Sequence, residues 1–176
     1  MKFLLFLLAA ISLNIEATIF SSKAIVHPEV GKNGMVVSQH YLATNAGHSI
    51  LAEGGNAYDA SIAVAFALAV VLPRAGNIGG GGFMVMFDEA SQKSFSIDYR
   101  ETAPEAATKK MFLASDGSVD RKKATQGVLS IGVPGTVYGM WEVHKKFGSL
   151  PWSELLAPAI KLAEDGFLIS PFMADA

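Results

Sequence analysis

Four consecutive glycines, Gly79 to Gly82, place the strongest constraint on how this chain can fold. Glycine in regular structure costs roughly 0.5–1 kcal/mol of stability relative to alanine, so the run indicates a backbone requirement that other residues would not meet. The requirement is either a positive φ angle or a very close approach by another segment. An apolar segment precedes the run, and Phe83 to Phe87 follow it as a predicted core strand. The glycines therefore predict a tight crossover from a helix to a strand.

A phosphate-binding loop is the alternative interpretation of the same glycines. Such loops follow a strand and open a helix, so that the helix N-terminus meets the anion. Here the order is reversed, and no Lys-Ser or Lys-Thr pair follows Gly82. The order and the missing lysine both disfavour a nucleotide-binding module, which remains an alternative for testing.

The elements before the glycines are predicted from periodicity and capping residues. Met35 to Val37 form a short strand candidate, and Ser38 can cap a helix that runs to about Glu53. Asn56, with Asp59 three residues later, predicts a capping box at the start of a second helix, which ends near Val71. That second helix is apolar almost all round, which predicts burial on every face.

The elements after the glycines alternate between strands and helices. Ser94 to Tyr99 alternates polar and apolar residues and predicts the second strand of a hairpin with Phe83 to Phe87. Residues 105–126 suggest a helical stretch and a polar loop, and Val128 to Val133 suggest a short strand. Two further helices are predicted, one opened by Pro134-Gly135 and ending near Phe147, the other spanning Ser153 to Asp165. Helices around a small sheet indicate the α/β (α+β) class.

The composition narrows the classes of function. The chain has 176 residues, of which 51% are hydrophobic and 17% charged, and its formal net charge is −2, so we expect a buried core and no nucleic-acid partner. The absence of cysteine excludes disulfides and thiolate metal sites. The histidines do not have metal-ligand spacing, and we expect no metal and no cofactor; they are His27, His40, His48 and His144.

The first 17 residues are predicted to be a secretory signal peptide. Lys2 precedes an apolar run from Phe3 to Leu13 that is short for a membrane span, and Ala17 could precede the cleavage site. Ile15 stands where a small residue is usual, so an uncleaved anchor remains an alternative. We expect an exported protein, periplasmic or extracellular, whose domain occupies residues 18–176.

Arg100 is the candidate binding residue. It follows the second hairpin strand and lies near Asp98 and Glu101 in sequence, so a local ion pair is one interpretation. The other is that its planar guanidinium forks onto a substrate carboxylate. Serine, threonine and histidine residues form no recognisable nucleophile elbow or triad; Thr102 and Thr136 are interpreted as turn or cap residues.

Three stretches together resemble the start of the gamma-glutamyltransferase (glutathione hydrolase) proenzymes. They are Glu53 to Ala60, with the sequence EGGNAYDA, Pro73 to Phe83, PRAGNIGGGGF, and Ile97 to Pro104, IDYRETAP. Gly132 to Val137 and Pro158 to Gly166 extend the resemblance, which covers about residues 35–170.

The resemblance implies a fold and a chemistry. The fold would be part of the four-layer αββα sandwich of the N-terminal-nucleophile hydrolases, and the precursor would cut itself into a large and a small subunit. The new N-terminal threonine of the small subunit would attack gamma-glutamyl amides such as glutathione and pass the acyl group to water, an amino acid or a peptide.

The resemblance also assigns roles to residues of this chain. Arg100 would bind the alpha-carboxylate of the glutamyl group. The glycines Gly79, Gly80, Gly81 and Gly82 would pack behind the site as closely approaching backbone. Tyr99 stands where members of the family often have phenylalanine.

The end of the chain suggests a fragment of the large subunit. Helical composition resumes after Ser170-Pro171 and stops at Ala176, so the threonine nucleophile would lie beyond the chain. We expect incomplete sequencing rather than a biological truncation, because a separate front half would expose the apolar face of its sheet. We also expect the chain alone to be inactive. A related amide acylase of the cephalosporin-acylase type and a non-catalytic exported protein remain alternatives.

Overall fold

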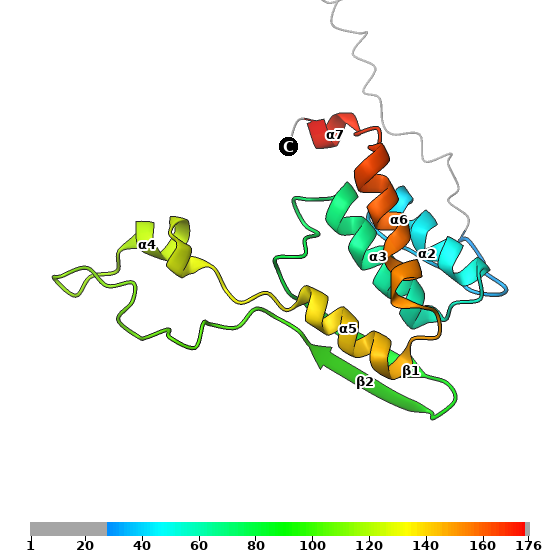
Figure 1. Ribbon diagram of the computed structural model, residues 1–176, viewed down its shortest axis with the longest axis horizontal. Coiled ribbons are helices and arrows are strands. Elements are labelled where there is room, and N and C mark those ends of the chain that lie inside the picture. The colour runs from blue at the N-terminus through cyan, green and yellow to red at the C-terminus, as the bar shows by residue number, and fades with distance from the viewer. Residues whose placement is uncertain (1–27, 175–176) are drawn as a thin grey trace, which may run out of the picture. The chain divides into compact units, whose positions relative to one another are not determined.

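The computed structural model describes residues 28–174. The chain divides into two compact units, Met1–Lys32 and Asn33–Ala176. Of the first unit only residues 28–32 are described, so the predicted signal peptide, residues 1–17, lies outside the described residues. The second unit contains every helix and strand described below (Figure 1).

Two helices, α2 (Tyr41–Ala52) and α3 (Ala57–Val71), pack closely because small residues line their contact. Ala43 and Ala46 of α2 are buried with Ala67 of α3. A methyl group on Gly47 would lie 2.6 Å from a methyl carbon of Val64. The absence of a side chain at Gly47 therefore lets the helices approach.

The segment before α2 differs from the prediction. Residues 35–37 are not a strand, because this stretch finds no backbone partner; instead Val36 packs against the core. The predicted cap at Ser38 is also wrong, since the cap is His40, whose Nδ1 accepts the backbone N–H of Leu42 at 3.3 Å. Ser38 braces this cap by donating to the His40 carbonyl at 2.9 Å.

The predicted capping box at the start of α3 is confirmed. The Asn56 side chain accepts the backbone N–H groups of Tyr58 and Asp59, while the Asp59 carboxylate accepts the N–H of Asn56 at 3.0 Å. The same two side chains reach a distant loop. Asp59, which is fully buried, accepts the backbone N–H of Ser149 at 3.1 Å and its hydroxyl at 2.5 Å, and Asn56 donates to the Phe147 carbonyl at 2.7 Å.

Burial of α3 is extensive but incomplete. Helices α2, α5 (Thr136–Phe147) and α6 (Trp152–Asp165) contact it and bury Ile62 and Phe66. Leu68 and Val70 remain half-buried, so the prediction of burial on every face is only partly confirmed.

The predicted hairpin is confirmed as an antiparallel pair of strands, β1 (Phe83–Asp88) and β2 (Lys93–Asp98). The register pairs Met84 with Ile97 and Met86 with Phe95, so these four side chains share the face that packs on the core. The alternate residues of β1 leave an exposed apolar face, made up of Phe83, Val85 and Phe87.

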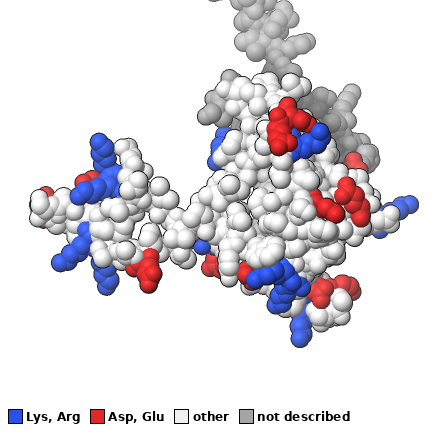
Figure 2. Space-filling model, viewed as in Figure 1, with Lys and Arg blue, Asp and Glu red and all other residues white. Residues whose placement is uncertain are grey.

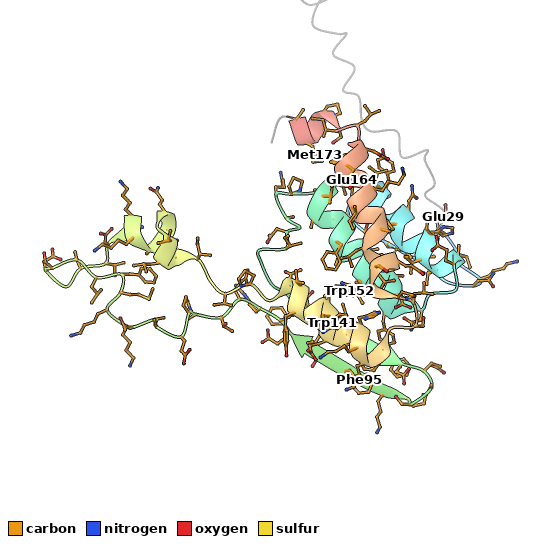
Figure 3. All side chains as sticks on the ribbon, viewed as in Figure 1. Glu29, Phe95, Trp141, Trp152, Glu164 and Met173 are labelled. Atoms are coloured by element: carbon orange, nitrogen blue, oxygen red, sulfur yellow. The ribbon has the colours of Figure 1, made fainter. Side chains whose placement is uncertain are left out.

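Helix α5 lies against the core-facing side of the hairpin and joins α6 through an aromatic cluster (Figures 1 and 3). The rings of Trp141 and Trp152 meet edge to face, with their centroids 5.3 Å apart. His144 packs on both rings and donates from Nε2 to the Leu150 carbonyl, 2.8 Å away. The predicted ends of both helices at Gly148 and Gly166 are confirmed.

The segment between the hairpin and α5 contains less regular structure than predicted. The only helix within residues 105–126 is α4 (Arg121–Gln126), and the expected strand at Val128 to Val133 is instead a 3₁₀ turn, η1 (Val128–Ser130), followed by a single bridge. That bridge joins Val133 to Thr102, so only one end of the expected strand finds a partner. Figure 1 shows the segment projecting away from the helices. The last helix described is α7 (Pro171–Ala174).

Two further findings apply to residues 28–174 only. None of their helices combines the length and apolar character that crossing a bilayer requires. No three of their His, Asp and Glu side chains gather where they could hold a metal ion.

We expect Asp59→Ala to lower the free energy of unfolding by about 3 kcal/mol, because it leaves buried donors of Ser149 and Asn56 without an acceptor. Thermal unfolding of the full-length protein measures the loss. Ser61→Ala is the control, since Ser61 lies on the exposed side of the same helix and bonds only within it; it should change stability by no more than about 0.5 kcal/mol. Equal losses in the two variants would contradict a special role for the buried carboxylate.

Candidate functional site

Arg100 lies on the turn that follows β2, and its side chain is largely exposed. The Asp98 carboxylate accepts the backbone N–H of Arg100 at 3.0 Å, which shapes the turn. The side chain is 68% exposed, and its Nε lies 3.7 Å from a carboxylate oxygen of Glu101. An exposed ion pair of this length contributes about 0–1 kcal/mol. The predicted local ion pair is therefore present, yet most of the guanidinium faces solvent.

The backbone at Arg100 is enclosed by glycines from two other segments. A methyl group on Gly81 would lie 2.6 Å from the Tyr99 carbonyl oxygen and 2.7 Å from the Cα atom of Arg100. A methyl group on Gly135 would overlap the same carbonyl oxygen. Neither glycine has a positive φ angle. Close approach, rather than backbone conformation, therefore requires glycine at both positions.

The side chain of Tyr99 is enclosed in the same way. A methyl group on Gly139 of α5 would overlap the Cβ and Cγ atoms of Tyr99, and one on Gly82 would lie 3.0 Å from its ring. Burial raises the pKa of the Tyr99 hydroxyl above its ordinary value. The ring is therefore part of the packing between the hairpin and α5.

The other two glycines of the run have different environments. The carbonyl of Gly80 accepts the backbone N–H groups of Gly135 and Thr136, at 2.8 and 3.1 Å, and so ties the run to the start of α5. Gly79 has no such contact, since the nearest atom to a methyl group there would be the Asn77 side-chain oxygen at 3.8 Å. Close approach thus applies to Gly80, Gly81 and Gly82 but not to Gly79.

Sequence reasoning missed Gly135 and Gly139 as neighbours of Arg100. One signal was available, because Gly139 interrupts a segment that is otherwise helical and costs about 1 kcal/mol relative to alanine there. The sequence could indicate that Gly139 serves some packing purpose, but not that its neighbour is Tyr99.

The same contacts oppose phosphate binding by the glycines. The N–H groups at the start of α5 are the helix N-terminus closest to the run, and the Gly80 carbonyl already occupies two of them. The run leads from α3 into β1, so no helix begins at its end.

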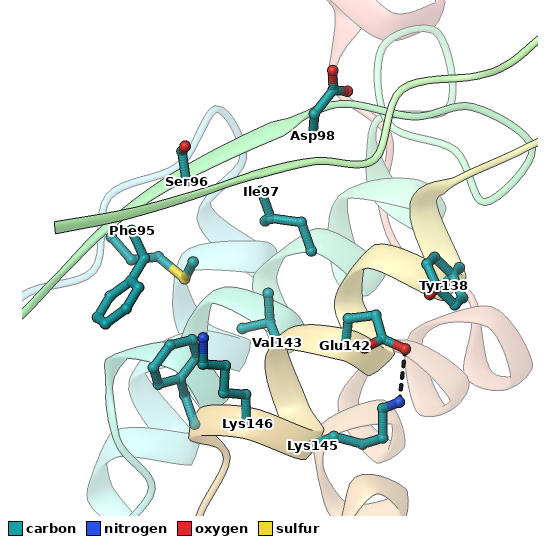
Figure 4. Close-up of a pocket in the computed structure, with 11 residues that line it drawn as sticks. Phe95, Ser96, Ile97, Asp98, Tyr138, Glu142, Val143, Lys145 and Lys146 are labelled. Atoms are coloured by element: carbon teal, nitrogen blue, oxygen red, sulfur yellow. Dashed lines mark ion pairs between the residues drawn. The ribbon is translucent and has the colours of Figure 1, made fainter.

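A groove of about 590 Å³ lies between β2 and α5 (Figure 4). Phe95 and Ile97 point into it towards α5, whereas Ser96 and Asp98 point away from the helix. Arg100 does not line it.

The cations of the groove already have partners. Lys145 pairs with Glu142 at 2.7 Å, and the Lys146 nitrogen lies 4.9 Å from the centre of the Phe95 ring. The groove is therefore the seam along which the hairpin packs on α5, and Arg100 lies outside it. On the face in Figure 2, positive and negative side chains are interspersed rather than separated into one basic patch.

Comparison with known proteins identifies relatives of the whole described unit. The family described as gamma-glutamyltranspeptidase matches residues 43–176. The glutathione hydrolase proenzyme of Pseudomonas aeruginosa is 46% identical over 164 residues, which are 93% of this chain and 29% of that protein. The Escherichia coli protein of the same name is 46% identical over 151 residues, 86% of this chain and 26% of that protein.

Solved structures agree with these relatives. The crystal structure of Helicobacter pylori gamma-glutamyltranspeptidase is 50% identical with a TM-score of 0.80, covering 85% of this chain and 42% of that one. A cephalosporin acylase from Bacillus halodurans is 33% identical with a TM-score of 0.67, covering 89% and 30% of the two chains. The predicted fold class, an α/β part of the N-terminal-nucleophile hydrolase sandwich, is confirmed. The chain spans less than a third of the length of these two curated relatives.

We expect neither inorganic phosphate nor ATP to raise the melting temperature of the protein. A ligand at a hundredfold excess over its dissociation constant would stabilise a real site by about 2.7 kcal/mol. Thermal unfolding across a titration of each ligand measures the effect. A concentration-dependent rise that Gly81→Ala abolishes would contradict our interpretation of the glycines.

Proposed function

The chain belongs to the gamma-glutamyltranspeptidase family, and from that premise we propose that the full-length protein hydrolyses or transfers the gamma-glutamyl group of glutathione and related amides. The observation that carries the proposal is the position of Arg100. It presents a mostly unencumbered guanidinium at the end of β2, inside one of the three stretches on which the resemblance rests.

The proposed reaction is covalent acyl transfer. The hydroxyl oxygen of an N-terminal threonine attacks the gamma-carbonyl carbon, the C–N bond breaks, and the departing amine takes up a proton. Water, an amino acid or a peptide then attacks the ester, and the threonine hydroxyl recovers its proton. The threonine belongs to the small subunit of the proposed precursor, so the residues of this chain contribute binding rather than the nucleophile.

Arg100 would bind the alpha-carboxylate of the glutamyl group. A guanidinium offers two parallel N–H donors that match the two oxygens of a carboxylate. Each hydrogen bond between charged groups contributes about 1.5–3 kcal/mol. The long contact with Glu101 leaves donors of Arg100 available for this purpose.

Amide acylase activity of the cephalosporin-acylase type is the second candidate, because a cephalosporin acylase is among the similar structures. The two functions differ in their substrate requirement. A gamma-glutamyl enzyme depends on the alpha-carboxylate that Arg100 would bind, whereas an acylase accepts acyl groups without it.

Export is also part of the proposal. The pattern of residues 1–17 supports a signal peptide and therefore a periplasmic or extracellular enzyme. An uncleaved anchor would instead retain residues 1–17, which mass spectrometry of the secreted protein would detect.

We expect Arg100→Lys in the full-length protein to lower kcat/KM for a gamma-glutamyl amide by about ten- to a hundredfold. A point charge replaces a fork and one of two charged hydrogen bonds is lost, which costs about 1.5–3 kcal/mol. Steady-state kinetics on substrates with and without the alpha-carboxylate measures the loss.

The matched control is Arg121→Lys, which makes the same exchange at an exposed position on α4. It should leave kcat/KM unchanged. If Arg100→Lys also leaves it unchanged, Arg100 does not bind the substrate. If the loss is equal for substrates lacking the carboxylate, the acylase function is favoured.

We expect the purified 176-residue chain to cleave no gamma-glutamyl amide above a heat-treated control, because it would lack the nucleophile. The full-length protein should instead yield two subunits, the smaller beginning with threonine, as N-terminal sequencing would detect. Amide cleavage by the isolated chain would contradict the proposed nucleophile.

A further inference from the structure

We propose that three glycines, Gly81, Gly135 and Gly139, are positioning residues that set the direction in which Arg100 projects. We call them the glycine clamp. This inference rests on the proposed function, since it concerns how the substrate-binding arginine is held. The argument comes from the atoms that surround the backbone of Tyr99 and Arg100.

The atoms closest to Gly81 belong to backbone, which cannot move independently of the turn. A methyl group there would lie 2.6 Å from the Tyr99 carbonyl oxygen and 2.7 Å from both Arg100 Cα and the Glu101 nitrogen. Real methyl groups essentially never approach other atoms within 3.0 Å. A larger residue must therefore displace either the turn at Arg100 or the start of β1.

The start of β1 is held more firmly than the turn. Gly80 accepts two N–H groups from the start of α5, and the Gly82 carbonyl accepts the N–H of Tyr99 at 3.0 Å. The turn has fewer restraints, because the Arg100 side chain is 68% exposed. Pressure from Gly81 would therefore move the turn and, with it, the guanidinium at the end of a long side chain.

Gly135 and Gly139 hold the turn through α5. They are one helical turn apart, and both are buried against Tyr99. Alanine at Gly139 would favour the helix by about 1 kcal/mol. Glycine at this position therefore sacrifices helix stability for the close approach of Tyr99, the residue immediately before Arg100.

A general packing role would also require glycines here, so the test must separate packing from positioning. Displacing a binding group by about 1 Å can cost a hundredfold in rate. If the clamp acts through Arg100, its effect must disappear when the arginine is already removed, which a double-mutant cycle measures. A packing defect would persist without Arg100.

The experiment compares Gly81→Ala with Gly79→Ala in the full-length enzyme, each alone and combined with Arg100→Ala. Gly79 is the matched control, because it belongs to the same run but has its nearest neighbour at 3.8 Å and no positive φ angle. With a gamma-glutamyl amide as substrate, we expect Gly81→Ala to raise KM about tenfold or more. Gly79→Ala should stay within about twofold of the parent. In the Arg100→Ala background, Gly81→Ala should add less than about twofold.

Two results would overturn the inference: equal behaviour of Gly81→Ala and Gly79→Ala, or a Gly81→Ala effect that persists without Arg100. If Gly81→Ala does not fold, Gly82→Ala decides. Its methyl group would meet only the movable Tyr99 ring, at 3.0 Å. A rise in KM that requires Arg100 supports the clamp, and no rise or an independent one overturns it. Failure of the proposed function gives a different result, because Arg100→Ala alone would then leave kcat/KM unchanged.

Discussion

The buried carboxylate of Asp59 is the interaction on which the arrangement of the helices depends. It closes the capping box of α3 and also accepts both donors of Ser149, in the loop that joins α5 to α6. A fully buried carboxylate is stable only when hydrogen bonds replace its lost hydration. Asp59 therefore holds the end of α5 in a fixed place against the start of α3, and Asn56 adds a bond to the last residue of α5.

With one end of α5 held by Asp59, the other end positions the candidate site. The first turn of α5 is bound by the Gly80 carbonyl, and its glycines admit the backbone and ring of Tyr99. The hairpin, the glycine run and α5 thereby meet at Tyr99 and the residue after it. Arg100 projects from this rigid junction on a short exposed turn, which is how binding groups are commonly presented.

Several elements could be predicted from sequence because their signals are local. The capping box at Asn56 and Asp59, the hairpin alternation and the helix stops at Gly148 and Gly166 each depend on residues within one or two turns, and the structure confirms them. The strands predicted at residues 35–37 and 128–133 are absent because a strand needs a partner. Local composition shows β-propensity, but it does not say whether another strand lies alongside.

The sequence by itself determined that the backbone at Gly79 to Gly82 must meet an unusual demand, and it singled out Arg100 as a candidate for binding a carboxylate. Only the tertiary structure decided that the demand is close approach rather than positive φ, that Gly79 is exempt, and that Gly135 and Gly139 take part. The physical reason is the range of the contacts. Whether a glycine is required for space depends on which atoms lie opposite it, and those atoms belong to segments that only folding brings together.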